Sequence, residues 1–167
     1  MDKNNCSSSV HAQMARKNFL CGYNCPQSVL LSYADFLEIK GLDVSTVLKM
    51  ASPFGGGISR LREVCGAVSA LCMLIGLTRG YDTPDDEMKT ALYTKIQELA
   101  GQFGSMNGSI ICRVLLGLDH HQDEPVPEKR TAQYYENRPC ANLCAAAAAL
   151  FEPYYEEEMA LIKAEKD

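Results

Sequence analysis

The sequence contains no tryptophan, and its apolar residues do not alternate with polar ones over any useful length. Such alternation is the mark of a half-buried strand, so no strand is expected. The longest strongly apolar run covers 11 residues, 67–77, and is too short to cross a bilayer. The first residues, MDKNNCSSSVHAQM, lack the apolar segment of a secretory signal. We therefore expect a cytoplasmic protein without membrane insertion.

Clusters of lysine and arginine are also missing. The formal net charge is −5 and the sequence pI is about 5.2, which argues against a nucleic-acid partner because such proteins neutralise phosphates with grouped cations. The 47% of hydrophobic and 22% of charged residues are ordinary for a globular protein. At 167 residues the chain is long enough for a single domain, residues 1–167, with a substantial core.

Apolar residues recur at three- and four-residue steps along most of the chain, which predicts helices. The expected segments, with Asp43, Ser59 and Thr83 as N-caps, are 9–21, 25–39, 43–51, about 59–77, 83–103, 110–117 and 139 onward. The polar, proline-containing residues 119–130 are expected to form a surface loop. The prediction is an all-α, compact bundle of about six to seven helices, with the charged residues 153–167 as a C-terminal helical extension.

Eight cysteines is a high number for a chain of this length in a reducing compartment, where a disulfide framework is not expected. Metal binding or redox chemistry is the better interpretation. The chain has none of the paired C-x-x-C knuckles of a zinc ribbon, and no C-x-x-C-H that would attach haem covalently.

Three cysteines lie at predicted helix starts. Cys25 precedes Pro26 and is expected at an N-cap, Cys140 follows Pro139, and Cys112 lies in a first turn that Ser109 would cap. Backbone N–H groups and the positive end of the helix dipole at such positions stabilise a thiolate or an anionic cluster. Burial as a small apolar side chain would explain any one of them, but explains the repeated placement less well.

Cys65 is expected a turn or more inside its helix. The neighbouring Gly66 is disfavoured there by about 1 kcal/mol relative to alanine. A glycine at this position indicates close approach of another backbone or of a bulky group such as a metal cluster. Close helix packing and chemistry remain equally open for this pair of residues.

The succession GYNCPQSVL, FGGG, CGAVSALCMLIGL, GSIICRVLLG and RPCANLCAAAA resembles the family of redox-active proteins named C_GCAxxG_C_C for its cysteines. The resemblance spans about residues 13–152 and preserves the order of the elements. It maps the four cysteines of the family onto Cys25, Cys65, Cys112 and Cys140. Residues 65–70 stand in the place of its glycine-containing motif, with Ala70 where the family has its last glycine.

The resemblance implies a helical domain with redox or electron-transfer chemistry. Relatives in which a similar domain is joined to c-type haem modules favour iron–sulfur binding, with zinc as the less favoured metal. Four thiolates from distant segments suit either metal. Gly56 and Gly57 of the glycine-rich turn, and also Gly66, are then predicted to approach the cofactor, although a plain helix connector is the slightly better explanation of the turn.

The remaining candidates have weaker signals. Cys21 and Cys144 each lie four residues from a predicted site cysteine and are either resolving thiols or buried neighbours. Cys72 is expected to pack in the core. Cys6 is expected to have no role in the site. Arg60 and Arg62 would either offset an anionic cluster or be solvated. Asp119, His120 and His121 resemble metal ligands in type, but adjacent histidines in a polar loop are expected to be exposed.

Three functions follow from these patterns. The first is an electron-transfer protein with an iron–sulfur cluster on the four cysteines, serving a redox partner protein or a small-molecule electron carrier. The second is a metal-free thiol/disulfide oxidoreductase using the same cysteines. The third is a helical interaction module with inert cysteines. The acidic charge and apolar helices are also compatible with a homodimer.

Overall fold

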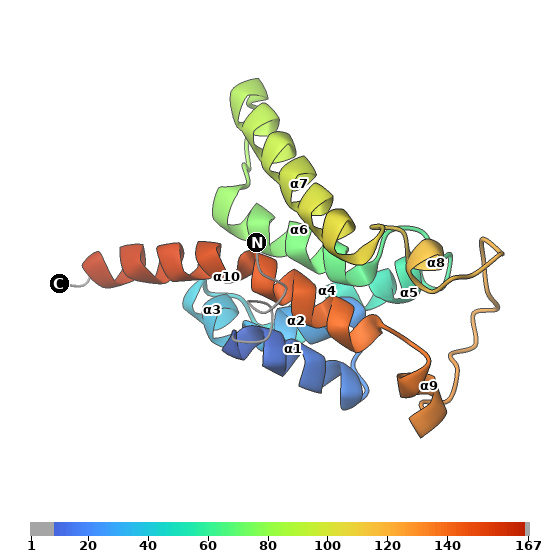
Figure 1. Cartoon of the computed structure of the whole chain (residues 1–167). Helices are drawn as coiled ribbons and strands as arrows, with labels where there is room; N and C mark the ends of the chain where they lie inside the picture. Colours follow the sequence, from blue (N-terminus) through green and yellow to red (C-terminus); the bar gives the residue numbers. More distant parts are fainter. Residues whose placement is uncertain (1–8, 166–167) are drawn as a thin grey trace.

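The computed structural model describes residues 9–165, and every regular element in that range is a helix (Figure 1). The prediction of an all-α fold is therefore confirmed. The elements in chain order are α1 (Val10–Leu20), α2 (Cys25–Ser32), α3 (Ala34–Ile39), α4 (Val44–Ala51), the 3-10 turn η2 (Ser52–Phe54), α5 (Gly55–Ile58), α6 (Gly66–Arg79), α7 (Asp86–Asn107), α8 (Cys112–Leu115), α9 (Ala132–Glu136) and α10 (Cys140–Ala164).

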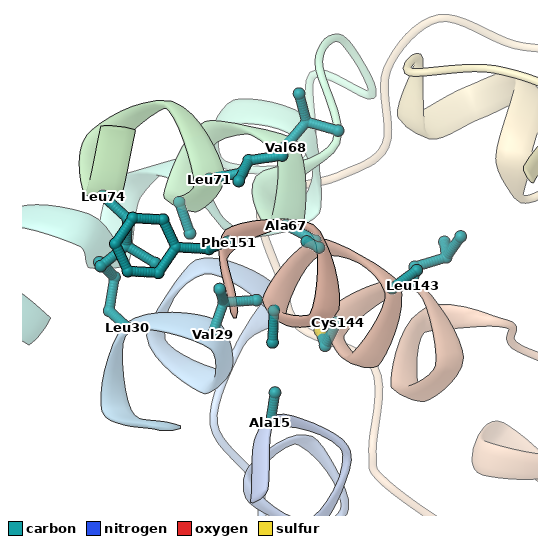
Figure 2. Packing of buried hydrophobic residues seen from close by; sticks show 14 of the residues in the cluster. Ala15, Val29, Leu30, Ala67, Val68, Leu71, Leu74, Leu143, Cys144 and Phe151 are labelled. Atoms are coloured by element: carbon teal, nitrogen blue, oxygen red, sulfur yellow. The ribbon is translucent and has the colours of Figure 1, made fainter. Parts of the chain in front are cut away.

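The core lies between α1, α2, α6 and α10, which pack against one another although α10 is more than 60 residues beyond α6 in the chain. Figure 2 shows the side chains of Ala15, Val29, Leu71, Cys144 and Phe151 brought together from these four helices. All five are almost completely buried. The many alanines of α10 let the neighbouring helices approach it closely, because a methyl group adds little thickness to a helix.

Two helices extend beyond this core. Helix α7 leaves the body at an angle, and the end of α10 continues away from it (Figure 1). Only Leu99 and Phe103, in the second half of α7, are buried. The predicted C-terminal extension is not a separate element, because α10 runs without interruption through Pro153 to Ala164.

Several predicted boundaries were wrong, for local reasons. The segment 25–39 is divided into two helices at Tyr33, whose backbone leaves the helical region at φ −111° and ψ 32°. The helix expected from Thr83 begins at Asp86, because the Asp85 side chain accepts the N–H of Met88 and caps it. The short helices α3, α5 and α9 add to the six to seven that were expected, and the helix expected over 110–117 is reduced to α8. The loop expected over 119–130 is confirmed, as is the Asp43 cap.

None of the helices within residues 9–165 combines the length and the apolar character that a membrane span requires.

Candidate functional site: a cysteine cluster at four helix starts

Each of the four predicted site cysteines stands at the N-terminus of a helix. Cys25 is the first residue of α2, Cys65 the N-cap of α6, Cys112 the first residue of α8 and Cys140 the first residue of α10. Their backbone N–H groups and those of the following residues belong to the first helical turn, where no intrahelical acceptor is available. We refer to these four residues, with Cys144, as the cysteine cluster.

The exact cap positions differ from the prediction by one or two residues. Asn24, not Cys25, caps α2, because the Asn24 and Gln27 side chains exchange hydrogen bonds with each other's backbone in a capping box. Ile111 occupies the N-cap of α8, while the Ser109 hydroxyl accepts the N–H of Ile111 at 3.0 Å. Both cysteines therefore lie in the first turn.

The expected position of Cys65 inside a helix was wrong. The backbone before it is left-handed rather than helical, with positive φ at Ile58, Ser59, Arg60 and Arg62. A right-handed helix cannot include these residues, so α6 begins only at Gly66. This correction places Cys65 at the start of its helix, one position before the place that the other three cysteines take in theirs.

Cys65 and Cys112 are held together by pairing of the two segments that precede their helices. Val64 and Ile111 form an isolated antiparallel bridge. The Cys65 N–H donates to the Ile110 carbonyl at 2.8 Å, and the Cys112 N–H donates to the Glu63 carbonyl at 2.6 Å. The starts of α6 and α8 are thereby fixed side by side.

Cys25, Cys140 and Cys144 form the other half of the cluster. The side chains of Cys25 and Cys140 are within hydrogen-bonding reach of each other. The Cys144 thiol donates to the Cys25 carbonyl with a sulfur–oxygen distance of 3.6 Å. Cys65 interacts electrostatically with both Cys140 and Cys112, which joins the two halves. The tertiary structure thus brings together sulfur atoms from four distant parts of the chain.

Gly66 makes the approach of α2 to α6 possible. A Cβ atom at this position would lie 2.6 Å from Cδ of Pro26, 2.7 Å from the Phe54 carbonyl oxygen and 3.3 Å from Cβ of Cys25. The interpretation of Gly66 as a point of close backbone approach is therefore confirmed. Contact of Gly56, Gly57 and Gly66 with a cofactor stays a prediction.

Burial and mutual interaction keep the thiols of the cluster protonated. Burial raises the pKa of Cys65 to about 12. For Cys140, the hydrogen bond with Cys25 and then burial raise the pKa. The hydrogen bond from Cys140 lowers the pKa of Cys25, but Cys144 and burial raise it more, so the net direction is upward. Burial also raises the pKa of Cys144.

Arginines are the cations that act on the cluster. Burial raises the pKa of Cys112 overall, while Arg62 and Arg138 oppose the rise by favouring the thiolate. Arg138 acts on Cys140 in the same direction. Arg62 is 3% exposed, and its Nη1 lies 3.9 Å from the Cys112 sulfur. Of the two interpretations of Arg62, the structure supports charge compensation and not solvation.

The other predicted candidates lie outside the cluster. Cys21 is exposed, and Cys72 is half-buried and packs against the core, as expected for a structural residue. His120 and His121 are exposed in the loop, also as expected. Cys6 lies outside the described residues.

Two members of this region were not identified as such from the sequence. Cys144 belongs to the cluster, and its signal was the four-residue step from Cys140, which places both on one helix face. Asp123 pairs with Arg60 and Arg62. Asp123 lies in a polar loop 61 residues from Arg62, and nothing in the sequence indicated that the two side chains would pair.

Within residues 9–165, no three His, Cys, Asp or Glu side chains are grouped so that a single metal ion could bind among them. The thiolates that hold an iron–sulfur cluster are distributed over two or more iron atoms, so they need not converge on one point.

Comparison with known proteins gives one match. The model of the family described as "Putative redox-active protein (C_GCAxxG_C_C)" matches residues 23–154, a range that begins ten residues later than the resemblance noted above and includes the whole cysteine cluster. No curated protein and no solved structure matches the chain. The match covers most of the chain, and the protein therefore belongs to the C_GCAxxG_C_C family of redox-active proteins.

Proposed function

We propose that the protein transfers electrons through an iron–sulfur cluster bound by Cys25, Cys65, Cys112 and Cys140. The observation that carries the proposal is the meeting of these four cysteines, each at a helix N-terminus, although they are separated by 28 to 47 residues in the chain. Packing alone requires neither four thiols in one place nor a helix start for each of them.

The donor set fits such a cluster chemically. Cysteine thiolates are the usual ligands of iron–sulfur clusters, which gain and lose single electrons when bound. The raised thiol pKa values show that the cysteine cluster is costly to ionise by itself. A cation among the sulfurs removes that cost, because metal-bound thiols are deprotonated.

The chain would supply three further conditions for electron transfer. The starts of α2, α6 and α10 present positive dipole ends to an anionic group, and the backbone N–H groups of Ala67 and Val68 interact with the Cys65 sulfur. Arg62 and Arg138 add positive charges that act on Cys112. Burial among the helices shields most of the sulfurs from water, since Cys65, Cys112 and Cys140 are each less than a tenth exposed. Hydrogen bonds and limited solvent access are the factors by which proteins adjust the potential of such clusters.

The hydrogen-bonded pair Cys25 and Cys140 supports a second candidate, a metal-free thiol oxidoreductase. In that case the two thiols would form one disulfide and pass two electrons and two protons to an oxidant. The raised pKa of both thiols opposes this function, because thiol–disulfide exchange begins with attack by a thiolate.

We further propose a redox partner protein or a small-molecule electron carrier as the source of electrons. A reducing, cytoplasmic location accords with the seven free cysteines of the described residues.

The test is anaerobic purification followed by measurement of iron, acid-labile sulfide and visible absorption per chain. The proposal predicts a brown protein. Single changes of Cys25, Cys65, Cys112 or Cys140 to serine should each remove most of the bound iron. The matched controls Cys21→Ser and Cys72→Ser, outside the cluster, should retain it.

A colourless protein that binds no iron even after anaerobic reconstitution would contradict the proposal. If such a protein loses two titratable thiols on mild oxidation, and Cys25→Ser or Cys140→Ser prevents the loss, the oxidoreductase is the correct function. If none of the serine variants changes redox behaviour, the cysteines are structural.

A further inference from the structure

Arg62 is the one charged side chain of the described residues that is both almost fully buried and within reach of a sulfur of the cysteine cluster. It is 3% exposed, and its Nη1 lies 3.9 Å from the Cys112 sulfur. Burial of a guanidinium is costly unless its donors are paired. A residue that only filled space at this position would not need a positive charge.

The other donors of Arg62 are taken up by Asp123. The Nε of Arg62 donates to Oδ2 of Asp123 at 2.8 Å, and Nη2 of Arg62 pairs with the same oxygen atom. Arg60 also pairs with Asp123, at 3.0 Å, and donates from Nε to the Glu124 carbonyl at 2.6 Å. Asp123 therefore fixes the orientation of Arg62 and reduces the positive charge that the cluster experiences.

The backbone that carries these two arginines is in an energetically unfavourable conformation. Ile58, Ser59, Arg60 and Arg62 all have positive φ, between 46° and 72°. For residues with a side chain this conformation costs roughly 1–2 kcal/mol each. The turn is held by hydrogen bonds from the Arg62 N–H to the Gly56 carbonyl at 3.3 Å and from the Glu63 N–H to the Gly57 carbonyl at 3.1 Å. Such strain persists where the surroundings fix it, and it is concentrated at functional sites.

We propose that Arg62 is a positioning residue that raises the reduction potential of the cysteine site, and that Asp123 limits this effect. This inference rests on the proposed iron–sulfur function. Each electron that the site accepts makes it one unit more negative. A buried cationic donor facing the Cys112 sulfur stabilises this reduced state, because charge and hydrogen bonds to sulfur set the potential.

The two partners predict shifts of opposite sign, which a purely structural role would not produce. Arg62→Gln should lower the equilibrium constant for one-electron reduction about tenfold, which corresponds to a fall of about 59 mV. Asp123→Asn should raise the potential, since it removes the negative charge that opposes Arg62. Arg62→Lys keeps the charge but loses the fixed geometry, and its potential should lie between those of the wild type and Arg62→Gln.

The experiment is an anaerobic titration of the cluster-loaded full chain with dithionite, followed by visible absorption. The matched control is Arg16→Gln, which removes one positive charge from an exposed side chain whose Nε donates to the neutral Asn142 at 3.1 Å. Its potential should change much less than that of Arg62→Gln, because solvent screens an exposed charge.

The outcomes separate the inference from the function it rests on. A wild type that takes up no iron would refute the iron–sulfur function itself. If the wild type takes up iron but both Arg62→Gln and Asp123→Asn have its reduction potential, the role of Arg62 is overturned. Shifts of the potential in the same direction in both variants would overturn it as well. If Arg62→Gln does not fold, Asp123→Asn and Arg62→Lys still decide the sign.

Discussion

The Cβ atom that an alanine would add at Gly57 would lie 2.7 Å from the Cβ of Cys112. It would also lie 2.7 Å from the Glu63 backbone nitrogen, so the obstacle is main chain as well as side chain. The glycine has φ +68°, in the left-handed region. The cysteine cluster therefore depends on a residue without a side chain beside Cys112.

Gly57→Ala is expected to destabilise the protein by about 2 kcal/mol or more, through both overlap and backbone strain. The measurement is urea unfolding followed by circular dichroism. The control is Gly76→Ala in the last turn of α6, where nothing lies within 4 Å of the added Cβ. That change should stabilise the protein by up to about 1 kcal/mol, because alanine is the better helix former. Equal effects of the two changes would refute the close packing at Gly57.

Alkylation of the metal-free protein by iodoacetamide should follow burial. The exposed Cys21 should react first, and Cys65 and Cys144 last. Because burial raises the pKa of Cys65 to about 12, its thiolate fraction and its rate should still increase above pH 10. Mass spectrometry of peptides after timed quenching gives each rate. Modification of Cys65 as fast as Cys21 at pH 8 would show that the cluster is open to solvent.

Glu158 should make stability depend on pH. Burial raises its pKa, but hydrogen bonds from Lys40 at 2.6 Å and Arg79 at 2.8 Å lower it, and the net direction is downward. The stabilisation is therefore complete above the unfolded pKa of about 4.3 and is lost as the pH falls through the lower folded value.

Glu158→Gln should cost about 1 kcal/mol at pH 7 and progressively less below pH 4, as measured by urea unfolding across this range. The exposed neighbour Glu156, changed to glutamine, should alter stability by less than about 0.5 kcal/mol. A deficit of Glu158→Gln that stays constant down to pH 3 would contradict the ion pairs.

Tyr33 links α2 to α10 through its hydroxyl, which donates to the Ala148 carbonyl at 2.8 Å and lies 3.1 Å from Oε2 of Glu152. The ring is fully buried. Tyr33→Phe should lower the free energy of unfolding by about 1–2 kcal/mol, because buried acceptors lose their donor while the packing is kept. Tyr23→Phe, on an exposed ring, should have almost no effect. Thermal unfolding of both variants would show the difference.

The helical class and the placement of the cysteines were predictable because they depend on near neighbours in the chain. Three- and four-residue spacing, the Asp43 cap and prolines beside Cys25 and Cys140 all act within one or two turns. The same local rules failed at Thr83, where the competing Asp85 cap lies two residues away. They also failed at Cys65, since a left-handed turn stabilised by tertiary contacts has no simple local signal.

The sequence by itself determined that the protein is helical and that Cys25, Cys112 and Cys140 stand near helix starts, since side-chain periodicity and capping are local. Only the tertiary structure decided that those starts meet, that Cys144 joins them and that Arg62 is buried against Asp123. The last two relations join residues 119 and 61 positions apart. They exist only after apolar burial has packed the helices together, because the free energy of a buried charge or thiol depends on what surrounds it and not on its neighbours in the chain.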